Sequence, residues 1–209
     1  QLVKMTNQSI RLKHPDKDEY NALIWRMPKC SIFVNEPNFF NYQRVIGKGY
    51  NLTYPLNYKP VEGEWKTIEK VLRRSFEGHF EHAEGNSFDF IMDWIQLLIT
   101  KPKQKLPGII MKSGQNTGKS TILKMLMYML GYNAVKIRMS DLTNNFNLVY
   151  AMSTLTVVDE TEYGDGNFNS HLESILKNLI TESEVTIEAK GKDQFTAPQH
   201  NHLIMASNK

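Results

Sequence analysis

The stretch from Gly108 to Gly131 constrains the fold of this chain more than any other part of it. A short apolar run, Gly108–Met111, precedes a polar loop, and an amphipathic segment, Lys119–Leu130, follows it and ends at Gly131. The loop consists of Ser113, Gly114, Gln115, Asn116, Thr117, Gly118, Lys119, Ser120 and Thr121. A strand, a loop ending in Gly-Lys-Ser, and a helix are typical of a phosphate-binding loop in an α/β protein.

Each residue type in this loop suits a bound chain of phosphates. Gly114 and Gly118 let the backbone curl so that N–H groups point at phosphate oxygens, and the following helix adds the positive end of its dipole. Lys119 is expected to neutralise charge on the β- and γ-phosphates, and Ser120 to offer its hydroxyl to Mg²⁺. The pattern normally begins with glycine, and Ser113 stands in that place. A chance glycine-containing turn would leave the flanking strand and helix unexplained.

Two further apolar runs end in polar residues that can act on a nucleotide. Leu155–Val158 is rich in β-branched residues and leads into Asp159 and Glu160. Strand ends of one parallel sheet meet at the same edge, so we expect Asp159 to hold Mg²⁺ and Glu160 to polarise an attacking water. The run His202–Ser207 leads into Asn208, a weak signal alone because many strands end in Ser-Asn turns.

Between these two runs lies a predicted hairpin, Thr186–Phe195, with Lys190 and Lys192 at its turn. Basic side chains at a hairpin tip can follow a phosphate backbone. When these residues are considered by themselves, a solvated surface turn is the better explanation.

The rest of the chain divides at a charged, proline-bounded connector, Lys101–Pro107. Residues 106–209 are expected to form a P-loop α/β core with a mostly parallel sheet. Residues 61–105 are expected to form a small helical subdomain, with one amphipathic helix running to Phe80 and a second capped by Ser87. Residues 1–60, broken by prolines, are expected to be an irregular extension.

Composition excludes several classes of protein. The chain has 209 residues, of which 41% are hydrophobic and 22% charged, as in ordinary globular domains. Its one cysteine, Cys30, rules out an internal disulfide and a multi-cysteine zinc site. No apolar run is long enough for a membrane span and the first residues are polar, so we expect a cytoplasmic protein without a membrane partner.

The distribution of charge and the chain ends add two expectations. Residues up to Lys105 carry 16 Lys/Arg against 12 Asp/Glu, whereas the remainder carries 9 against 10. This basic bias permits a contact with nucleic acid or a neighbouring subunit. The absence of an initiator methionine and the ending at Ser207-Asn208-Lys209 lead us to expect a piece of a longer polypeptide, truncated at its C-terminus.

Taken in order, the four elements within Ser113–Lys209 resemble the superfamily 3 helicases. They are most similar to the helicase part of phage and plasmid primase–helicases and primase–polymerases. In that family a polar residue often stands ahead of Gly-Lys-Ser/Thr, as Asn116 does here, the acidic strand ends in Asp-Glu, and a third strand closes on Asn. Further similar segments are Tyr58–Gly63, Asp93–Ile95 and Leu179–Thr181.

The resemblance implies an AAA+-like ATPase that uses ATP and Mg²⁺ to move along single-stranded DNA. It implies a homo-oligomeric ring, a hexamer at full length, in which the hairpin lines a central pore. It also implies a primase or polymerase domain upstream in the same polypeptide, and host cytoplasm as the location if the source is viral. The implied site residues are Lys119, Glu160 and Asn208 for catalysis, Ser120 and Asp159 for the metal, and Lys190 and Lys192 for DNA.

One departure from the family concerns arginine. Family members use an arginine of the neighbouring subunit, usually located after the Asn motif. Only one of the six arginines here, Arg138, lies beyond Arg74. We therefore expect the 209 residues alone to hydrolyse ATP slowly and to form no stable ring.

Two other functions stay open. A P-loop kinase for small molecules is one, although such kinases usually carry an arginine-rich lid, and arginine is scarce here after Arg74. The other is a DNA-binding or oligomerisation scaffold that binds ATP and hydrolyses it weakly.

Overall fold

The computed structural model of this chain describes residues 30, 32–77, 85–115, 117–144, 147–161, 170–188 and 194–207, with the backbone alone for residues 159–161. Within these ranges no helix is both long and apolar enough to cross a membrane.

A parallel four-stranded sheet forms the centre of the molecule. Its strand order is β4, β9, β6, β5, and every neighbouring pair is parallel. The strands span Ile109–Lys112 (β4), His202–Ser207 (β9), Leu155–Thr161 (β6) and Ala134–Ile137 (β5). This arrangement confirms the predicted α/β class with a mostly parallel sheet.

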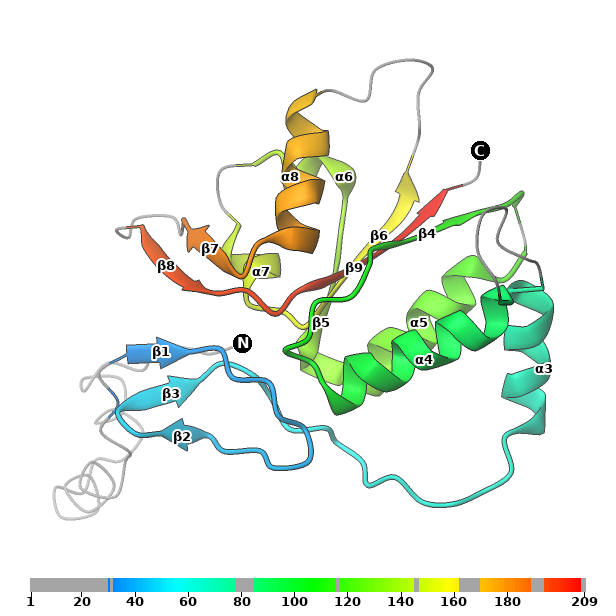
Figure 1. Cartoon of the computed structure of the whole chain (residues 1–209), viewed down its shortest axis with the longest axis horizontal. Helices are drawn as coiled ribbons and strands as arrows, with labels where there is room; N and C mark the ends of the chain where they lie inside the picture. The colour runs from blue at the N-terminus through cyan, green and yellow to red at the C-terminus, as the bar shows by residue number, and fades with distance from the viewer. Residues whose placement is uncertain are drawn as a thin grey trace, which may run out of the picture.

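Helices cover both faces of this sheet (Figure 1). On one face lie α4 (Ser87–Thr100) and α5 (Lys119–Leu130), and on the other lie α6 (Met139–Leu142), α7 (Leu148–Ala151) and α8 (Ser170–Thr181). Side chains of a strand alternate between faces. Residues that pack into the core cluster with α4 and α5 are Leu155, Val157, Ile204 and Ala206. Residues that pack into the cluster with α6 and α8 are Val158, Leu203 and Met205.

The two helices predicted before the connector are present, but their ends differ from the predicted ones. Helix α3 (Lys66–Ser75) ends before Phe76, so it is shorter than predicted; Phe80 lies outside the described residues. Helix α4 is capped one residue earlier than predicted: the Asn86 side chain accepts the Asp89 backbone N–H at 2.8 Å. Asparagine is as good an N-cap as serine, so the sequence alone did not separate the two positions.

Several short elements were not predicted. The turn η1 (Gly131–Asn133) and strand β5 follow α5 directly. A small sheet of order β1, β3, β2 lies in the first sixty residues. Its strands are Ile32–Val34, Gly49–Asn51 and Val45–Ile46, respectively. Elements of two to four residues are too short to show a hydrophobic period. The domain boundaries at residues 60 and 105 stay predictions.

Asn133 joins the small sheet to the core. Its side-chain oxygen accepts the Tyr54 backbone N–H at 2.7 Å, and its side-chain nitrogen donates to the Tyr54 carbonyl at 2.9 Å. The same nitrogen also donates to the Leu130 carbonyl at 3.0 Å. Asn133 is buried, so this amide replaces a backbone partner that the Tyr54 segment would otherwise lack.

The predicted hairpin is present: its strands β7 (Glu184–Ile187) and β8 (Phe195–Pro198) pair in antiparallel orientation. The Asn147 side chain, just ahead of α7, holds its first strand. That side chain donates to the Thr186 carbonyl at 2.8 Å and accepts the Glu188 N–H at 2.9 Å.

Buried side chains fix the segment that links this hairpin to β9. The Gln199 amide nitrogen lies within hydrogen-bond distance of three carbonyls at and just beyond the end of α8, those of Asn178, Leu179 and Glu182. The Asn201 amide nitrogen lies within hydrogen-bond distance of four oxygens, belonging to Tyr150, Ser153 and Thr156. The His202 ring lies between the carbonyls of Thr154 and Gln104, at 3.0 and 2.9 Å.

This segment makes stability depend on pH. Burial lowers the pKa of His200 to about 4, and burial also lowers the pKa of His202. Between about 4 and the unfolded value of about 6.5, the unfolded chain binds more protons than the folded one. The contribution of these histidines to the free energy of unfolding is therefore fully present above pH 6.5 and is lost as pH drops towards 4. We expect a loss of about 1–2 kcal/mol from His200, below the full linkage value because its ring is partly exposed.

Denaturant unfolding at a series of pH values checks this expectation. The His200→Gln variant should lose less stability than the parent between pH 6.5 and 4. An identical pH slope in parent and His200→Gln would contradict the assignment.

Candidate functional site

The predicted phosphate loop connects the end of β4 to the start of α5. Gly118 caps α5 with φ +93°, a left-handed conformation that favours glycine. A β-carbon added there would meet only the Ser75 hydroxyl, at 3.9 Å, so the backbone conformation rather than space requires glycine. Asn116 lies outside the described residues.

Oxygen atoms of the loop surround the Lys119 ammonium. Its Nζ lies 2.7 Å from the Ser113 carbonyl, 2.7 Å from the Gly114 carbonyl and 3.0 Å from the Ser113 hydroxyl. It is also 3.4 Å from the Thr117 hydroxyl. An ammonium has three N–H donors, so the loop can satisfy all of them. Lys119 is thus held at the loop by bonds that phosphate oxygens can replace.

Ser113 makes contacts that the usual glycine could not make. Its hydroxyl is 2.6 Å from the Thr117 hydroxyl, which itself donates to the Gly114 carbonyl at 3.0 Å. The departure from the glycine pattern therefore adds hydrogen bonds across the base of the loop. Ser120, in the first turn of α5, is exposed.

The sheet register relates this loop to the other two predicted site strands. Ser207, at the end of β9, pairs with Lys112 of β4 on one side and with Thr161 of β6 on the other. The Ser113 N–H also donates to the Ser207 carbonyl at 3.3 Å. Neighbouring strands lie about 4.8 Å apart, so the ends of β4 and β6 are about 10 Å apart.

The acidic strand is therefore not directly beside the loop strand, because β9 lies between them. Asn208 follows Ser207, the last residue of β9, in the sequence. Asn208 itself lies outside the described residues, as do Lys190 and Lys192.

A register shift falls at the predicted acidic pair. Val158 pairs with Met205 and Thr161 pairs with Ser207, so β6 uses one residue more than β9 between these pairs. The extra residue belongs to the step that contains Asp159 and Glu160. Bulges interrupt strict side-chain alternation and are frequent beside active sites. The two carboxylate residues thus stand at an irregularity of the backbone, and their side chains are outside the described part.

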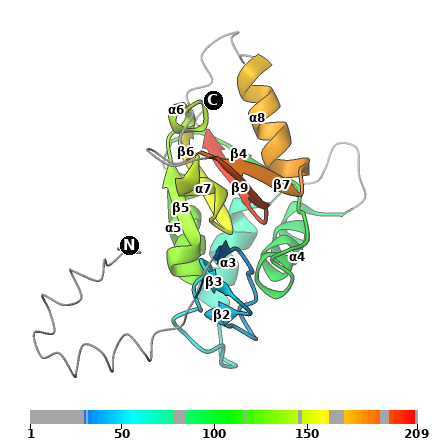
Figure 2. The ribbon, with the colours of Figure 1, turned by 90° about the vertical axis from the view of Figure 1, so that its left-hand side faces the viewer.

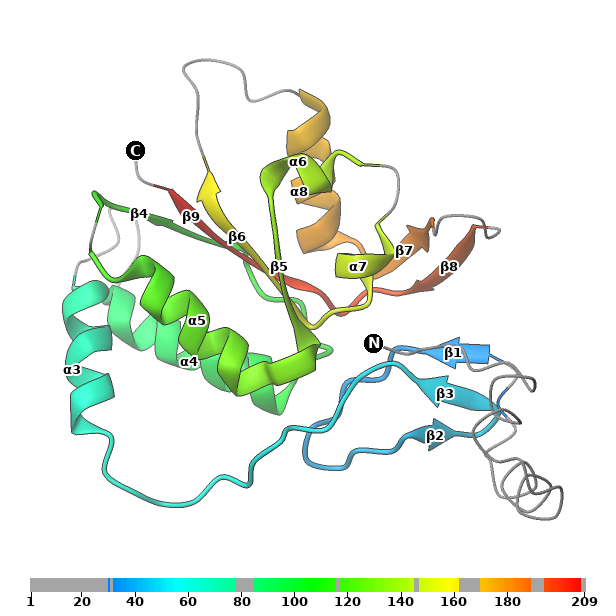
Figure 3. The same cartoon turned by 180° about the vertical axis from the view of Figure 1, so that it is seen from behind.

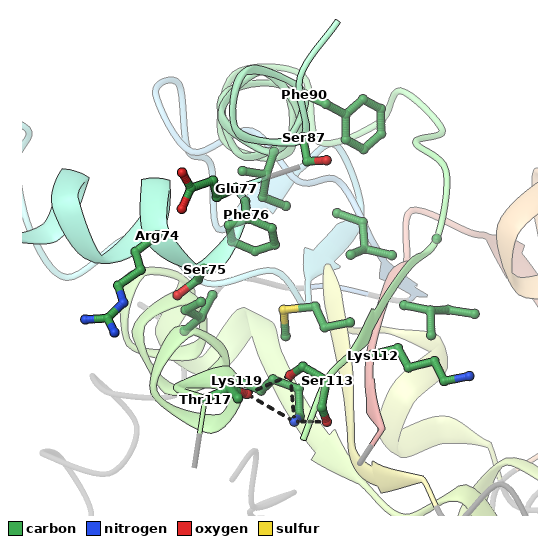
Figure 4. Close-up of a pocket in the computed structure, with 16 residues that line it drawn as sticks. Arg74, Ser75, Phe76, Glu77, Ser87, Phe90, Lys112, Ser113, Thr117 and Lys119 are labelled. Atoms are coloured by element: carbon green, nitrogen blue, oxygen red, sulfur yellow. Dashed lines mark hydrogen bonds between the residues drawn. The ribbon is translucent and has the colours of Figure 1, made fainter. Parts of the chain in front are cut away.

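A pocket of about 640 Å³ adjoins the loop (Figure 4). It lies between the end of α3, the start of α4, strand β4 and the loop itself. Phe76 and Glu77 line one side, Phe90 another, and Ser113 and Lys119 the base. Its volume and mixed apolar and polar lining are those of small-molecule sites. Sequence reasoning missed this pocket, because Phe76 was assigned to the buried face of a helix.

Arg74 also lines this pocket. In Figure 4 its guanidinium is turned away from the Phe76 ring. Arg74 lies in α3, far from the loop in sequence, and the fold places it at the rim of the same pocket. Arg138, by contrast, stands ahead of α6, where its backbone N–H donates to the Asp141 carboxylate at 2.8 Å.

Comparison with known proteins supports the fold. The apo structure of the NrS-1 C-terminal region (305–718) superposes with a TM-score of 0.73 at 18% identity, covering 98% of this chain and 49% of that one. The A form of the same region gives 0.66 at 17% identity, covering 91% and 46%. This chain shares the fold of that region. It spans about half the length of the NrS-1 structures.

Other similarities are weaker or less informative. The family model of DUF5906, described as a family of unknown function, matches residues 111–209. A JCV helicase structure gives a TM-score of 0.44 at 18% identity over 68% of this chain and 41% of that one, too low to indicate a common fold. No curated protein matches this sequence.

Proposed function

We propose that this chain is the ATP-dependent helicase or translocase module of a viral or mobile-element replication protein. In this proposal it hydrolyses ATP at a boundary between subunits of a ring and moves a basic hairpin along single-stranded DNA. One observation carries the proposal furthest: β9 pairs with both the loop strand and the acidic strand, so three motifs of the superfamily 3 resemblance belong to adjacent strands.

The loop residues would bind the triphosphate. Backbone N–H groups of residues 114–118 and the first turn of α5 would face the phosphates, and Lys119 would exchange its loop oxygens for phosphate oxygens. Bonds between Lys119 and the loop carbonyls hold its ammonium near the phosphate position before binding. This reduces the ordering that binding requires.

The donor set proposed for the metal fits Mg²⁺. A serine hydroxyl (Ser120) and a carboxylate (Asp159) are hard oxygen ligands of the kind that Mg²⁺ prefers. Bound Mg²⁺ would withdraw charge from the phosphate oxygens. Glu160 would accept a proton from the attacking water, and Asn208 would hydrogen-bond the γ-phosphate or that water. These roles rest on the motif positions and on the strand order.

The pocket beside the loop would receive the base and ribose. Phe76 offers an aromatic face for stacking, and Glu77 together with Ser75 and Ser87 offers polar partners. A nucleotide whose phosphates lie on residues 113–121 would have its base within reach of this pocket, where Phe76 supplies apolar contact.

The proposed partners follow from the same resemblance. Lys190 and Lys192 would contact single-stranded DNA, further copies of the chain would complete a ring, and a primase or polymerase domain would precede Gln1. Arg74 is a further candidate, besides an arginine downstream, for a guanidinium near the phosphates.

Phosphate release separates this proposal from a small-molecule kinase. With Mg²⁺ and ATP, we expect slow release of inorganic phosphate and no transfer to nucleosides, because small-molecule kinases usually carry an arginine-rich lid and Arg138 is the only arginine after Arg74. The Lys124→Ala variant, which changes an exposed lysine of α5 outside the phosphate loop, should keep the parent rate of phosphate release. Transfer of the γ-phosphate to a nucleoside would overturn the helicase proposal in favour of a kinase. Binding of ATP without any phosphate release would favour the scaffold.

A further inference from the structure

Six side chains of the small sheet and the core form a continuous series of contacts, here called the aromatic strip. Its members are Phe33, Tyr42, Arg44, Tyr50, Tyr54 and Tyr132. The Phe33 and Tyr50 rings meet edge-on with centroids 6.4 Å apart, and Tyr54 and Tyr132 lie 5.2 Å apart. The Arg44 guanidinium connects the two pairs, at 5.3 Å from the Tyr50 centroid and 5.0 Å from the Tyr54 centroid.

The two ends of the strip are open to solvent. Phe33 is 57% exposed and Tyr132 is 72% exposed, whereas the rings between them are half-buried. Single exposed aromatic residues are common on protein surfaces. Here the two exposed rings terminate one connected series, so each end presents ring surface that neighbouring rings hold in place.

Arg44 gives the strip a positive charge without a described counter-ion. Its Nη1 donates to the Asn51 carbonyl at 3.0 Å and the Thr53 carbonyl at 3.3 Å. Tyr42 is a third ring beside it, at 5.1 Å. Within the described ranges no carboxylate pairs with this guanidinium, although three other lysine or arginine residues there form ion pairs. The half of the chain up to Lys105 also has an excess of basic residues.

The strip is held rigidly at the joint between sheet and core. Tyr54 is fixed by the two hydrogen bonds between its backbone and Asn133, and Asn133 lies next to Tyr132. Rings positioned in this way lose little conformational freedom when a ligand stacks on them.

The small sheet also lies at the same end of the molecule as the β7–β8 hairpin. Figures 1 and 3 place both at the end opposite α3 and the phosphate loop, and Figure 2 shows both on the side that faces the viewer. A nucleic-acid strand bound at the hairpin would therefore lie at the same end of the molecule as the small sheet.

We propose that the aromatic strip is a second binding surface for single-stranded nucleic acid, with Phe33 and Tyr132 stacking on bases and Arg44 attracting the phosphate backbone. Aromatic faces alternating with an unpaired cation are the chemistry by which proteins hold single strands irrespective of sequence. A protein partner would instead call for a contiguous apolar surface, which the guanidinium interrupts. The strip acts without ATP and without Lys190 or Lys192, so it is separable from the proposed function.

Binding of a fluorescent oligothymidylate of about 16 nucleotides, without ATP, tests the strip. Phe33→Ala and Tyr132→Ala should each raise the Kd about fivefold to 100-fold, the range expected for the loss of one stacked base. Tyr128→Ala is the matched control, because Tyr128 is 87% exposed on α5 and makes no described aromatic contact. Each variant is also made in a Lys190→Ala, Lys192→Ala background, where any contribution of the hairpin is absent.

Two results would overturn the proposal. One is a Kd for Phe33→Ala and Tyr132→Ala equal to that of Tyr128→Ala in both backgrounds. The other is a change in oligomeric state, without a change in oligothymidylate affinity, which would assign the strip to a contact between proteins. Thermal unfolding of each variant guards against loss of the small sheet as the cause. Arg44→Lys, which keeps the charge and loses the planar guanidinium, should weaken binding less than Arg44→Gln.

Discussion

Replacement of Lys119 by alanine is expected to weaken the binding of Mg·ATP at least about 100-fold. A hydrogen bond to a charged group contributes about 1.5–3 kcal/mol, and Lys119 would form such bonds to more than one phosphate oxygen. Titration of a fluorescent ATP analogue, with the Kd as the readout, measures the effect.

The same ammonium bonds to the loop itself, so the variant also removes contacts to Ser113 and Gly114. Lys119→Met, which keeps most of the apolar stem and loses the ammonium, separates the loss of the stem from the loss of the ammonium. If Lys119→Met binds as weakly as Lys119→Ala, loss of the ammonium is the cause. Lys124→Ala, on an exposed part of the same helix, should bind like the parent. Unchanged affinity in Lys119→Ala would remove residues 113–121 from nucleotide binding.

Replacement of Glu160 by glutamine is expected to lower ATP hydrolysis about 10²- to 10⁴-fold, the usual contribution of a general base. The amide keeps the shape of the side chain but cannot accept the proton of the attacking water. Binding of Mg·ATP should change only a few-fold, since the loop is untouched. Single-turnover assays with protein in excess detect the change even when the parent is slow.

Glu184→Gln, an exposed glutamate of β7, is the matched control and should keep the parent rate. Retained turnover in Glu160→Gln would exclude Glu160 as the base. If Asp159→Asn lowers the rate of ATP hydrolysis by a similar factor and higher Mg²⁺ restores that rate, the metal role of Asp159 is separated from the proton role of Glu160.

Local sequence signals predicted the long elements of this fold. The amphipathic period of α4 and α5 and the β-branched run of β6 each reflect burial against one neighbouring layer, which a short window of residues records. Strand β5 consists of only four residues and includes Lys136, so its pattern was indistinguishable from a loop. The strands of the small sheet are shorter still.

The arrangement of the candidate site was less accessible to sequence reasoning. That Asp159 and Asn208 follow apolar strands is a local property, whereas the place of β9 between β4 and β6 is a pairing of segments about 45 to 95 residues apart. The register shift at Asp159–Glu160 also depends on the partner strand. Phe76 reaches the pocket because α3 ends at Ser75, the residue before it. The periodicity of apolar residues does not define this boundary.

Gln199, Asn201 and His202 have a consequence for motion. Their buried hydrogen bonds fasten the base of the β7–β8 hairpin to α8, α7, β6 and the connector, and Asn147 adds a bond between the start of α7 and β7. A hinge needs backbone that can change conformation at low cost, and this segment would have to break several buried bonds first. We therefore expect the described hairpin strands to move together with the sheet as one rigid body. In the proposed ring, these two strands would change position only together with the sheet of the same chain.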